Sequence, residues 1–318
     1  MKITPTPPSP VEGEGYREGG IFIKIHQTGG NEIMDIKKVI VLGAGSIGYQ
    51  IAQLCAQVGN EVILRDINDD LVQKGLKKIK EGIQRFYVDK GKISQEEGDR
   101  ITGRLRGTTD MSEARDCDLV IEAIPEIMDL KKQVFKELDS ICKPETIFGT
   151  NTSGLKIRDI GSLMNRQDKL IGLHFFNPVQ LMKLVEVVKT DRTSQDTIDI
   201  CLDYVKKLGK EPVVVKDSPG FVSTRLFMVF VNEAALMVDE GLASPADIDK
   251  IVRLGLNHPM GPLEIADLSI ETAVNVLNYF QEEMGDKYEP AKFFRECIKE
   301  GWLGVKTGRG FYDYSKKK

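Results

Sequence analysis

The segment Lys38–Gly59, KVIVLGAGSIGYQIAQLCAQVG, determines the fold of the first half of this chain. A short run rich in β-branched residues meets Gly43, Gly45 and Gly48 in G-x-G-x-x-G spacing, and an apolar pattern of helical period follows. A second apolar run then ends at Asp66. The glycines alone would indicate only a tight turn. Strand, glycine loop, helix, strand and terminal acid together predict a dinucleotide-binding βαβ unit.

The same unit predicts which cofactor groups are bound. The loop Gly43–Gly48, including Ser46 and Ile47, lets the backbone approach a pyrophosphate at the N-terminus of the helix. Asp66 would hydrogen-bond the adenosine ribose hydroxyls and repel a 2′-phosphate. We therefore expect NAD, although the neighbouring Arg65 leaves NADP open.

Composition excludes several classes of protein. With 318 residues, 41% of them hydrophobic, the chain can bury a large core and is expected to form two domains. A net charge of −4 argues against a nucleic-acid-binding protein, and no apolar run is long enough to cross a bilayer. Five scattered cysteines without C-x-x-C spacing are typical of reduced thiols in a cytoplasmic protein, and no metal-ligand pattern is present.

The chain divides into three parts. Residues 1–33 are rich in Pro, Gly and Glu and are interpreted as a disordered leader, or as a wrongly assigned start preceding translation from Met34. Residues 34–217 carry the strand and helix patterns of a Rossmann-type NAD-binding α/β domain, with a helical hairpin inserted at about 68–106. Beyond a Ser-Pro-Gly boundary, residues 218–318 predict an all-α domain.

The first helix of that second domain, expected over 221–240, is apolar nearly all round. Such a helix must be buried, either in the core or against another subunit.

The inserted hairpin is basic, with ten Lys and Arg against seven Asp and Glu. Its lysines Lys74, Lys77, Lys78 and Lys80 could contact the phosphates of a large anionic substrate. Their charge alone favours a solvated helix face.

A proton-transfer pair is predicted from the run 170–188, LIGLHFFNPVQLMKLVEVV. It holds His174, one of three histidines, and Glu186 inside an apolar segment. Burying an ionised carboxylate among aliphatic residues is costly unless a partner compensates it. Histidine is the natural partner because a carboxylate fixes its tautomer and stabilises the imidazolium. A further histidine, His258, is expected only to cap a turn.

Polar residues also follow two predicted strands. Glu126 lies after the strand at 119–124, and Asn151 and Ser153 lie after the strand at 146–149. Ligands of open α/β sheets bind at the carboxyl ends of strands, so these residues are well placed for a site, although ordinary loop capping accounts for each of them equally well.

These segments together resemble the 3-hydroxyacyl-CoA dehydrogenase family, in particular the bacterial 3-hydroxybutyryl-CoA dehydrogenases. The resemblance runs from about residue 36 to 314 and is carried by VIVLGAGSIG, VIEAIPE, TNTSGLKI, LHFFNPVQLMKLVEVV, KDSPGF, LGLNHPMGPLEIAD and GWLGVKTGRGFYDYS. It implies that His174 is the general base, that Glu186 orients it and that Ser153 contacts the substrate oxygen. It further implies the NAD contacts Glu126, Lys131, Asn151 and Asn177, CoA contacts from hairpin lysines such as Lys74 and Lys78, and a homodimer formed through the C-terminal domain.

One position departs from the family pattern. Many members carry asparagine where PGFVSTR places Thr224, and that asparagine helps to hold the histidine and the substrate. Threonine keeps a hydroxyl but is shorter and lacks the amide. Thr224 is therefore a candidate catalytic residue whose positioning role differs from that of the usual side chain.

The resemblance implies NAD-dependent oxidation of (S)-3-hydroxyacyl-CoA, as in fatty acid and butanoate metabolism. Two alternatives are open at this point. A dehydrogenase of another small hydroxy acid would not need the basic hairpin, and a non-catalytic NAD-binding structural or sensing protein would not need the intact set of His174, Glu186 and Ser153.

Overall fold

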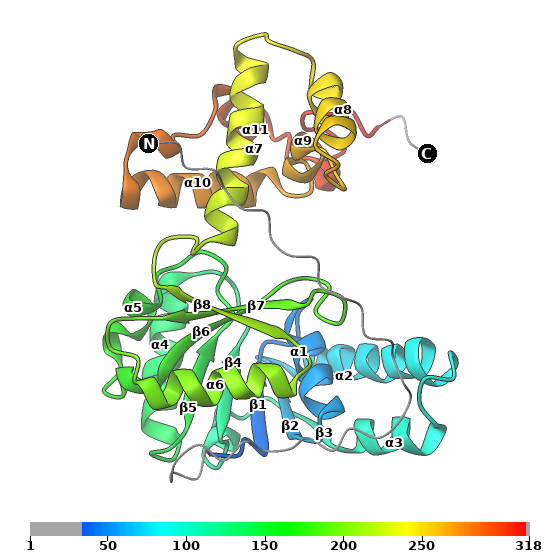
Figure 1. The fold of residues 1–318 in the computed structure, drawn as a ribbon, viewed down its shortest axis with the longest axis vertical. Helices are drawn as coiled ribbons and strands as arrows, with labels where there is room; N and C mark the ends of the chain where they lie inside the picture. Colours follow the sequence, from blue (N-terminus) through cyan, green and yellow to red (C-terminus); the bar gives the residue numbers. More distant parts are fainter. Residues whose placement is uncertain (1–33, 316–318) are drawn as a thin grey trace, which may run out of the picture. The chain divides into compact units, whose positions relative to one another are not determined.

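The first domain is built on one eight-stranded sheet, and the computed structural model describes residues 34–315. The predicted leader, 1–33, lies outside the described residues. The strands are β1 (Lys38–Leu42), β2 (Glu61–Arg65), β3 (Leu105–Thr108), β4 (Leu119–Glu122), β5 (Ile147–Thr150), β6 (Leu170–Phe175), β7 (Leu184–Lys189) and β8 (Glu211–Lys216). Their order is β3-β2-β1-β4-β5-β6-β7-β8, and every neighbouring pair is parallel except β6–β7 (Figure 1). The order 3-2-1-4-5-6 within it is that of a Rossmann sheet, which confirms the predicted fold class.

Six α-helices accompany the sheet: α1 (Gly48–Gln57), α2 (Asp69–Ile83), α3 (Gln95–Gly103), α4 (Met128–Ile141), α5 (Ile157–Ile160) and α6 (Gln195–Lys207). Residues on the central strands alternate between two apolar layers because successive side chains of a strand point to opposite faces. Val39 and Val41 pack with α1 and α6, whereas Ile40 and Leu42 pack with α4 and α5. The sheet is thus buried on both faces, as parallel sheets are.

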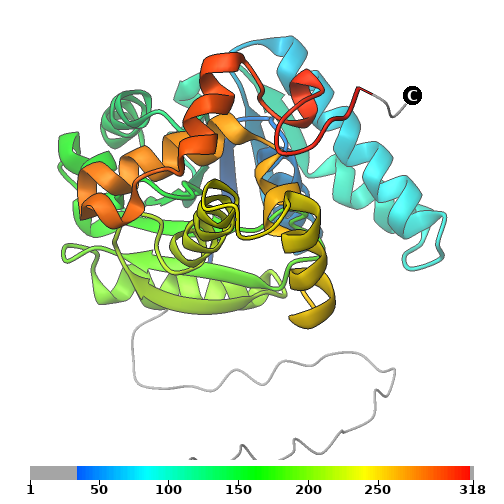
Figure 2. The same cartoon turned by 90° about the horizontal axis from the view of Figure 1, so that it is seen from above.

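The inserted hairpin is made of α2 and α3 and lies at the β3 end of the sheet (Figure 2). A π-helical turn, Gln84–Val88, extends α2, and the hydroxyl of Ser94 accepts a hydrogen bond from the backbone N–H of Glu97 at the start of α3. Strand β3 was not predicted. Its sequence, LRGT, contains a glycine and has no run of apolar residues, and it begins at Leu105, inside the range expected for the hairpin.

The second domain consists of α7 (Ser223–Asp239), α8 (Pro245–Gly255), α9 (Pro262–Ala266), α10 (Ile270–Met284) and α11 (Lys292–Glu300) around their own apolar core. The expected long apolar helix is α7, which begins two residues after Phe221. It is not fully buried within the chain. Leu226 on α7 is 68% exposed and Val229 is 45% exposed. The prediction that this helix is buried in the core is therefore wrong for the face that carries these two residues.

The glycine loop makes a stability prediction. A Cβ added to Gly48 would overlap the carbonyl oxygen of Gly43, whereas a Cβ on Gly45 would meet no atom within 4 Å. We expect Gly48→Ala to lower the free energy of unfolding by about 1–3 kcal/mol because backbone must shift to admit the methyl group. Urea denaturation measures this, with Gly45→Ala as the control. Equal stability of the two variants would contradict the packing role of Gly48.

Candidate active site

A groove lies at the carboxyl ends of the adjacent central strands β1 and β4, which is the ligand position in folds of this kind. Gly43 has a φ of +97°, and a Cβ there would clash with the carbonyl group of Ala123, so only glycine fits this approach of the two loops. Helix α1 starts directly behind with no side chain capping its N-terminus. The positive end of the helix dipole at this N-terminus favours an anionic group in the groove.

The groove encloses a cavity of about 740 Å³, a size typical of cofactor sites. It brings together most of the predicted cofactor residues: Gly43, Gly45, Ser46, Ile47, Asp66, Glu126 and Asn151, together with Ser153. Asp66 is fixed by backbone N–H groups, since its Oδ2 accepts from Ala44 at 2.6 Å and its Oδ1 from Ile67 at 2.7 Å. Arg65 lines the same cavity.

Lys131 occupies a different position from the other predicted cofactor residues. It is 1% exposed, and its ammonium lies 2.6 Å from Glu122 Oε1 and 3.2 Å from Glu126 Oε2. Glu126 Oε1 in turn accepts from the backbone N–H groups of Ser153 and Gly154. Lys131 therefore acts through Glu126 and fixes the loop that carries Ser153.

Two predicted asparagines are also held by the fold. The Oδ1 of Asn151 accepts from the backbone N–H of Phe175 on β6 at 2.8 Å, and the Oδ1 of Asn177 accepts from Gln50 Nε2 on α1 at 2.9 Å. Asn151 borders the cavity, whereas Asn177 and Gly48 support its walls from behind.

His174 and Glu186 form the predicted pair. They are directly opposite in the antiparallel register of β6 and β7, which puts both side chains on the same face of the sheet. His174 Nδ1 lies 2.8 Å from Glu186 Oε2, and the two residues are 5% and 2% exposed. The contact inferred from the cost of burying Glu186 is confirmed.

The second domain completes the environment of Glu186. The Ser223 hydroxyl donates to Glu186 Oε2 at 2.7 Å, and the backbone N–H groups of Val222 and Ser223 donate to Oε1 at 3.3 and 3.0 Å. Burial alone would raise the pKa of the Glu186 carboxyl, but the hydrogen bonds from His174 and Ser223 hold that pKa below its usual range. The carboxylate is thus ionised at neutral pH.

The other ring nitrogen of His174 is available for chemistry. Nε2 makes no hydrogen bond to any of residues 34–315, and no side-chain nitrogen or oxygen among them is both fully buried and unpaired. Nε2 is therefore reachable from outside. The ring packs against Phe176 and Phe221, with centroids 4.6 and 5.8 Å away, which fix its plane.

Ser153 follows β5 and His174 lies on β6, and the register pairs Thr150 with Gly172. Ser153 and His174 therefore belong to the same edge of the sheet, three and two residues beyond paired positions. The side-chain hydroxyl of Thr224, on the first turn of α7, makes no hydrogen bond within the described part of the chain.

The hairpin lysines are exposed on α2, away from the cavity lining. Lys78 lies 5.2 Å above the ring of Tyr49, and Lys77 pairs loosely with Glu81 at 3.8 Å. Both contacts are weak, so these ammonium groups are free to meet an anionic ligand.

Three functional side chains escaped sequence reasoning. Glu122 is fully buried at the end of an apolar strand, LVIE, and the signal that identified Glu186 could have identified it. Gln50 and Ser223 carried no signal because their contacts join elements distant in sequence.

Other expectations concern residues outside the groove. His258 Nδ1 bonds the backbone oxygen of Met260, which confirms the turn histidine. The five cysteines are buried and unpaired. Among the described residues there is no metal-ligating cluster of three His, Cys, Asp or Glu side chains, and no helix has the length and apolarity to cross a membrane.

Fold and site together define an oxidoreductase with a nicotinamide dinucleotide groove beside a buried His–Glu pair. Family models agree: the NAD-binding domain of 3-hydroxyacyl-CoA dehydrogenase matches residues 38–218, and its C-terminal domain matches residues 220–314. The chain belongs to the 3-hydroxyacyl-CoA dehydrogenase family, and NAD is its cofactor.

Individual relatives are similar over most of their length. A probable 3-hydroxybutyryl-CoA dehydrogenase of Bacillus subtilis is 43% identical over 89% of this chain and 99% of its own. The human mitochondrial hydroxyacyl-coenzyme A dehydrogenase is 39% identical over 88% of this chain and 91% of its own. The crystal structure of (S)-3-hydroxybutyryl-CoA dehydrogenase PaaH1 from Ralstonia eutropha superposes with a TM-score of 0.85 at 41% identity, covering 89% of this chain and all of that one.

The contact between Ser223 and Glu186 makes a prediction with a definite pH dependence. A hydrogen bond to a charged group stabilises by about 1.5–3 kcal/mol, and we expect Ser223→Ala to lose that amount at neutral pH. Because the folded-state pKa of Glu186 is depressed, this stability is present above the unfolded pKa of about 4.3 and is lost as the pH falls through the folded value.

The measurement is denaturant unfolding of wild type and Ser223→Ala between pH 7 and pH 3. Ser223→Thr, which keeps a hydroxyl, is the control, and in a Glu186→Gln background the cost of Ser223→Ala should shrink. A cost that stays constant with pH would show that the hydroxyl does not act on the carboxylate.

Proposed function

We propose that the protein oxidises (S)-3-hydroxyacyl-CoA to 3-oxoacyl-CoA with NAD, and catalyses the reverse, with His174 as the general base. The observation that supports this most is the buried His174–Glu186 pair, whose free ring nitrogen faces outward at the edge of the sheet that carries the dinucleotide groove. The 3-hydroxybutyryl-CoA dehydrogenases among its relatives favour a short acyl group.

The proposed step is balanced in protons and electrons. His174 Nε2 takes the proton of the C3 hydroxyl. NAD, which the glycine loop and Asp66 would hold, would supply the acceptor for the hydride of C3, so the products are a 3-oxo thioester and NADH. Glu186 stabilises the imidazolium through Nδ1, because an ionised carboxylate at 2.8 Å favours a positive charge on the ring. In the reverse direction the imidazolium is the acid.

Ser153 and Thr224 are proposed to position the reacting oxygen. Ser153 is exposed at the cavity wall, held by its backbone bond to Glu126, so its hydroxyl can meet the C3 oxygen. Thr224 follows Ser223 on the first turn of α7, and its hydroxyl is proposed to contact the same oxygen. The exposed ammonium groups of Lys74 and Lys78 are proposed to bind CoA phosphates.

Substitution of His174 tests the base. We expect His174→Ala to bind NADH normally while its kcat for acetoacetyl-CoA reduction falls about 10²–10⁴-fold, because the proton transfer then depends on water. Steady-state kinetics with NADH fluorescence titration measures both, and His258→Ala is the matched control. A near-normal kcat for His174→Ala would refute the assignment.

Faster turnover of free acetoacetate than of its CoA ester would instead indicate a dehydrogenase of small hydroxy acids.

We further propose that the protein is a homodimer paired through its helical domain, and that it acts in the cytoplasm, where its five unpaired cysteines would stay reduced. Several large apolar side chains of this domain are exposed in the single chain: Leu226, Val229, Ile251, Leu254 and Leu256. Exposure of this many large apolar side chains on one domain is typical of an association surface.

Leu254, which is 77% exposed on α8, tests the dimer. We expect wild type to sediment as a dimer and Leu254→Glu to shift toward monomer, since a charge buried at an apolar interface is costly. Sedimentation velocity measures this. Leu181→Glu, at a residue 75% exposed between β6 and β7, is the control that should remain dimeric. A monomeric wild type would contradict the proposal.

A further inference from the structure

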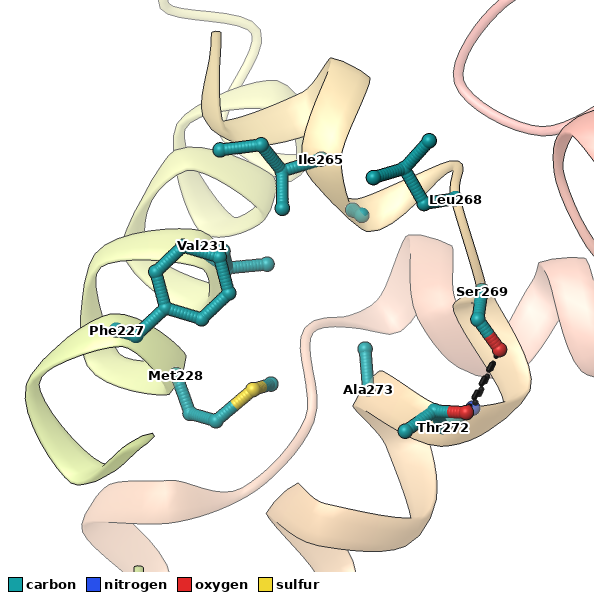
Figure 3. Close-up of a pocket in the computed structure, with 9 residues that line it drawn as sticks. Phe227, Met228, Val231, Ile265, Leu268, Ser269, Thr272 and Ala273 are labelled. Atoms are coloured by element: carbon teal, nitrogen blue, oxygen red, sulfur yellow. Dashed lines mark hydrogen bonds between the residues drawn. The ribbon is translucent and has the colours of Figure 1, made fainter. Parts of the chain in front are cut away.

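A second, smaller cavity lies inside the helical domain, between α7 on one side and α9 and α10 on the other (Figure 3). Its volume is about 210 Å³, below the range usual for drug-sized ligands. Phe227, Met228 and Val231 face Ile265, Leu268 and Ala273 across it.

The lining of this cavity is apolar. Its two hydroxyl groups, on Ser269 and Thr272, bond each other at 2.7 Å at the start of α10, as the dashed line in Figure 3 shows. With these polar atoms already paired, the cavity offers an apolar ligand no charge and little competition from ordered water.

Helical spacing connects this cavity to the candidate active site from both sides. On α10, Thr272 lines both cavities, and Val276, one turn further, lines the dinucleotide groove beside Ser153. On α7, Thr224 lies one turn before Phe227 and Met228, on the same face of the helix. The small cavity therefore adjoins the dinucleotide groove at Thr272, and Thr224 lies one helical turn from its α7 wall.

We propose that this cavity, which we call the α7–α10 pocket, binds the hydrocarbon tail of the acyl group beyond C3 and limits its length. The inference rests on the proposed function. In the proposed function, C3 is held at His174 and Ser153, and the CoA phosphates are held at the inserted hairpin. The hydrocarbon tail must therefore extend in a third direction, away from both. The α7–α10 pocket is the apolar space there. Phe227 and Leu268 are the exposed members of its apolar lining, at 38% and 59%, so a short tail fills the pocket and a longer one meets their side chains.

Two substitutions alter the pocket in opposite directions. Phe227→Ala enlarges it, whereas Ala273→Leu fills it at a position that is buried in its wall. Leu242→Ala is the matched control, because Leu242 lies just beyond the end of α7, is 68% exposed and does not line the pocket. The readout is the ratio of kcat/KM for 3-oxooctanoyl-CoA to that for acetoacetyl-CoA.

We expect Phe227→Ala to raise this ratio at least about tenfold and Ala273→Leu to lower it by a similar factor, since each methylene accommodated or rejected by an apolar pocket changes kcat/KM about tenfold or more. The control should leave it unchanged. Ratios that do not move in either variant, with acetoacetyl-CoA turnover intact, overturn the proposal, as does a Phe227→Ala variant whose only change is its oligomeric state.

Calorimetric binding separates this proposal from the proposed function. Octanoyl-CoA and butyryl-CoA can be measured as ligands without turnover. The ratio of their dissociation constants should shift in the same directions in the two variants. If wild type fails to reduce acetoacetyl-CoA but these binding ratios shift as expected, the reaction is wrong and the pocket stands. Binding ratios that stay constant across the variants reject the pocket.

Discussion

One buried carboxylate ties the two halves of this enzyme together. Glu186 lies inside an apolar sheet, where an isolated charge would be strongly unfavourable, and it is satisfied only by His174 from β6 and by Ser223 and the start of α7 from the helical domain. The same hydrogen bonds that make the charge tolerable also fix the histidine ring and anchor α7. The stability of the domain junction and the orientation of the proposed base therefore depend on the same group.

The loop that carries Ser153, beside the cofactor groove, also depends on a buried carboxylate. A second buried carboxylate, Glu122, is neutralised by Lys131, and Lys131 reaches Glu126, which holds the loop of Ser153 through backbone N–H groups. Proposed substrate contacts on this loop are thus held in place by an ion-pair network centred on the buried Lys131. Placing each reactive group on the end of a strand and supporting it from behind gives a site whose geometry does not depend on long flexible side chains.

Much of this could be predicted from the chain because its signals are local. The apolar, β-branched run from Val39 to Leu42, the glycine spacing and the terminal Asp66 predicted the βαβ unit, and the cost of burying Glu186 predicted its histidine partner. Strand β3 was missed since its sequence has neither alternation nor an apolar run. The expected burial of α7 in the core is wrong at Leu226, and its burial against another subunit stays a prediction. Lys131, implied as a cofactor contact, lies behind the cavity wall.

What the residues alone determined is the fold class, the family and the identity of the pair at the site, because glycine conformational freedom, apolar period and the energetic penalty of a lone buried charge act at each position regardless of distant partners. What only the tertiary structure decided is which distant groups meet. Ser223 reaching Glu186, Lys131 supporting Glu126, and the pocket between α7 and α10 depend on strand register and helix packing, which no local pattern encodes.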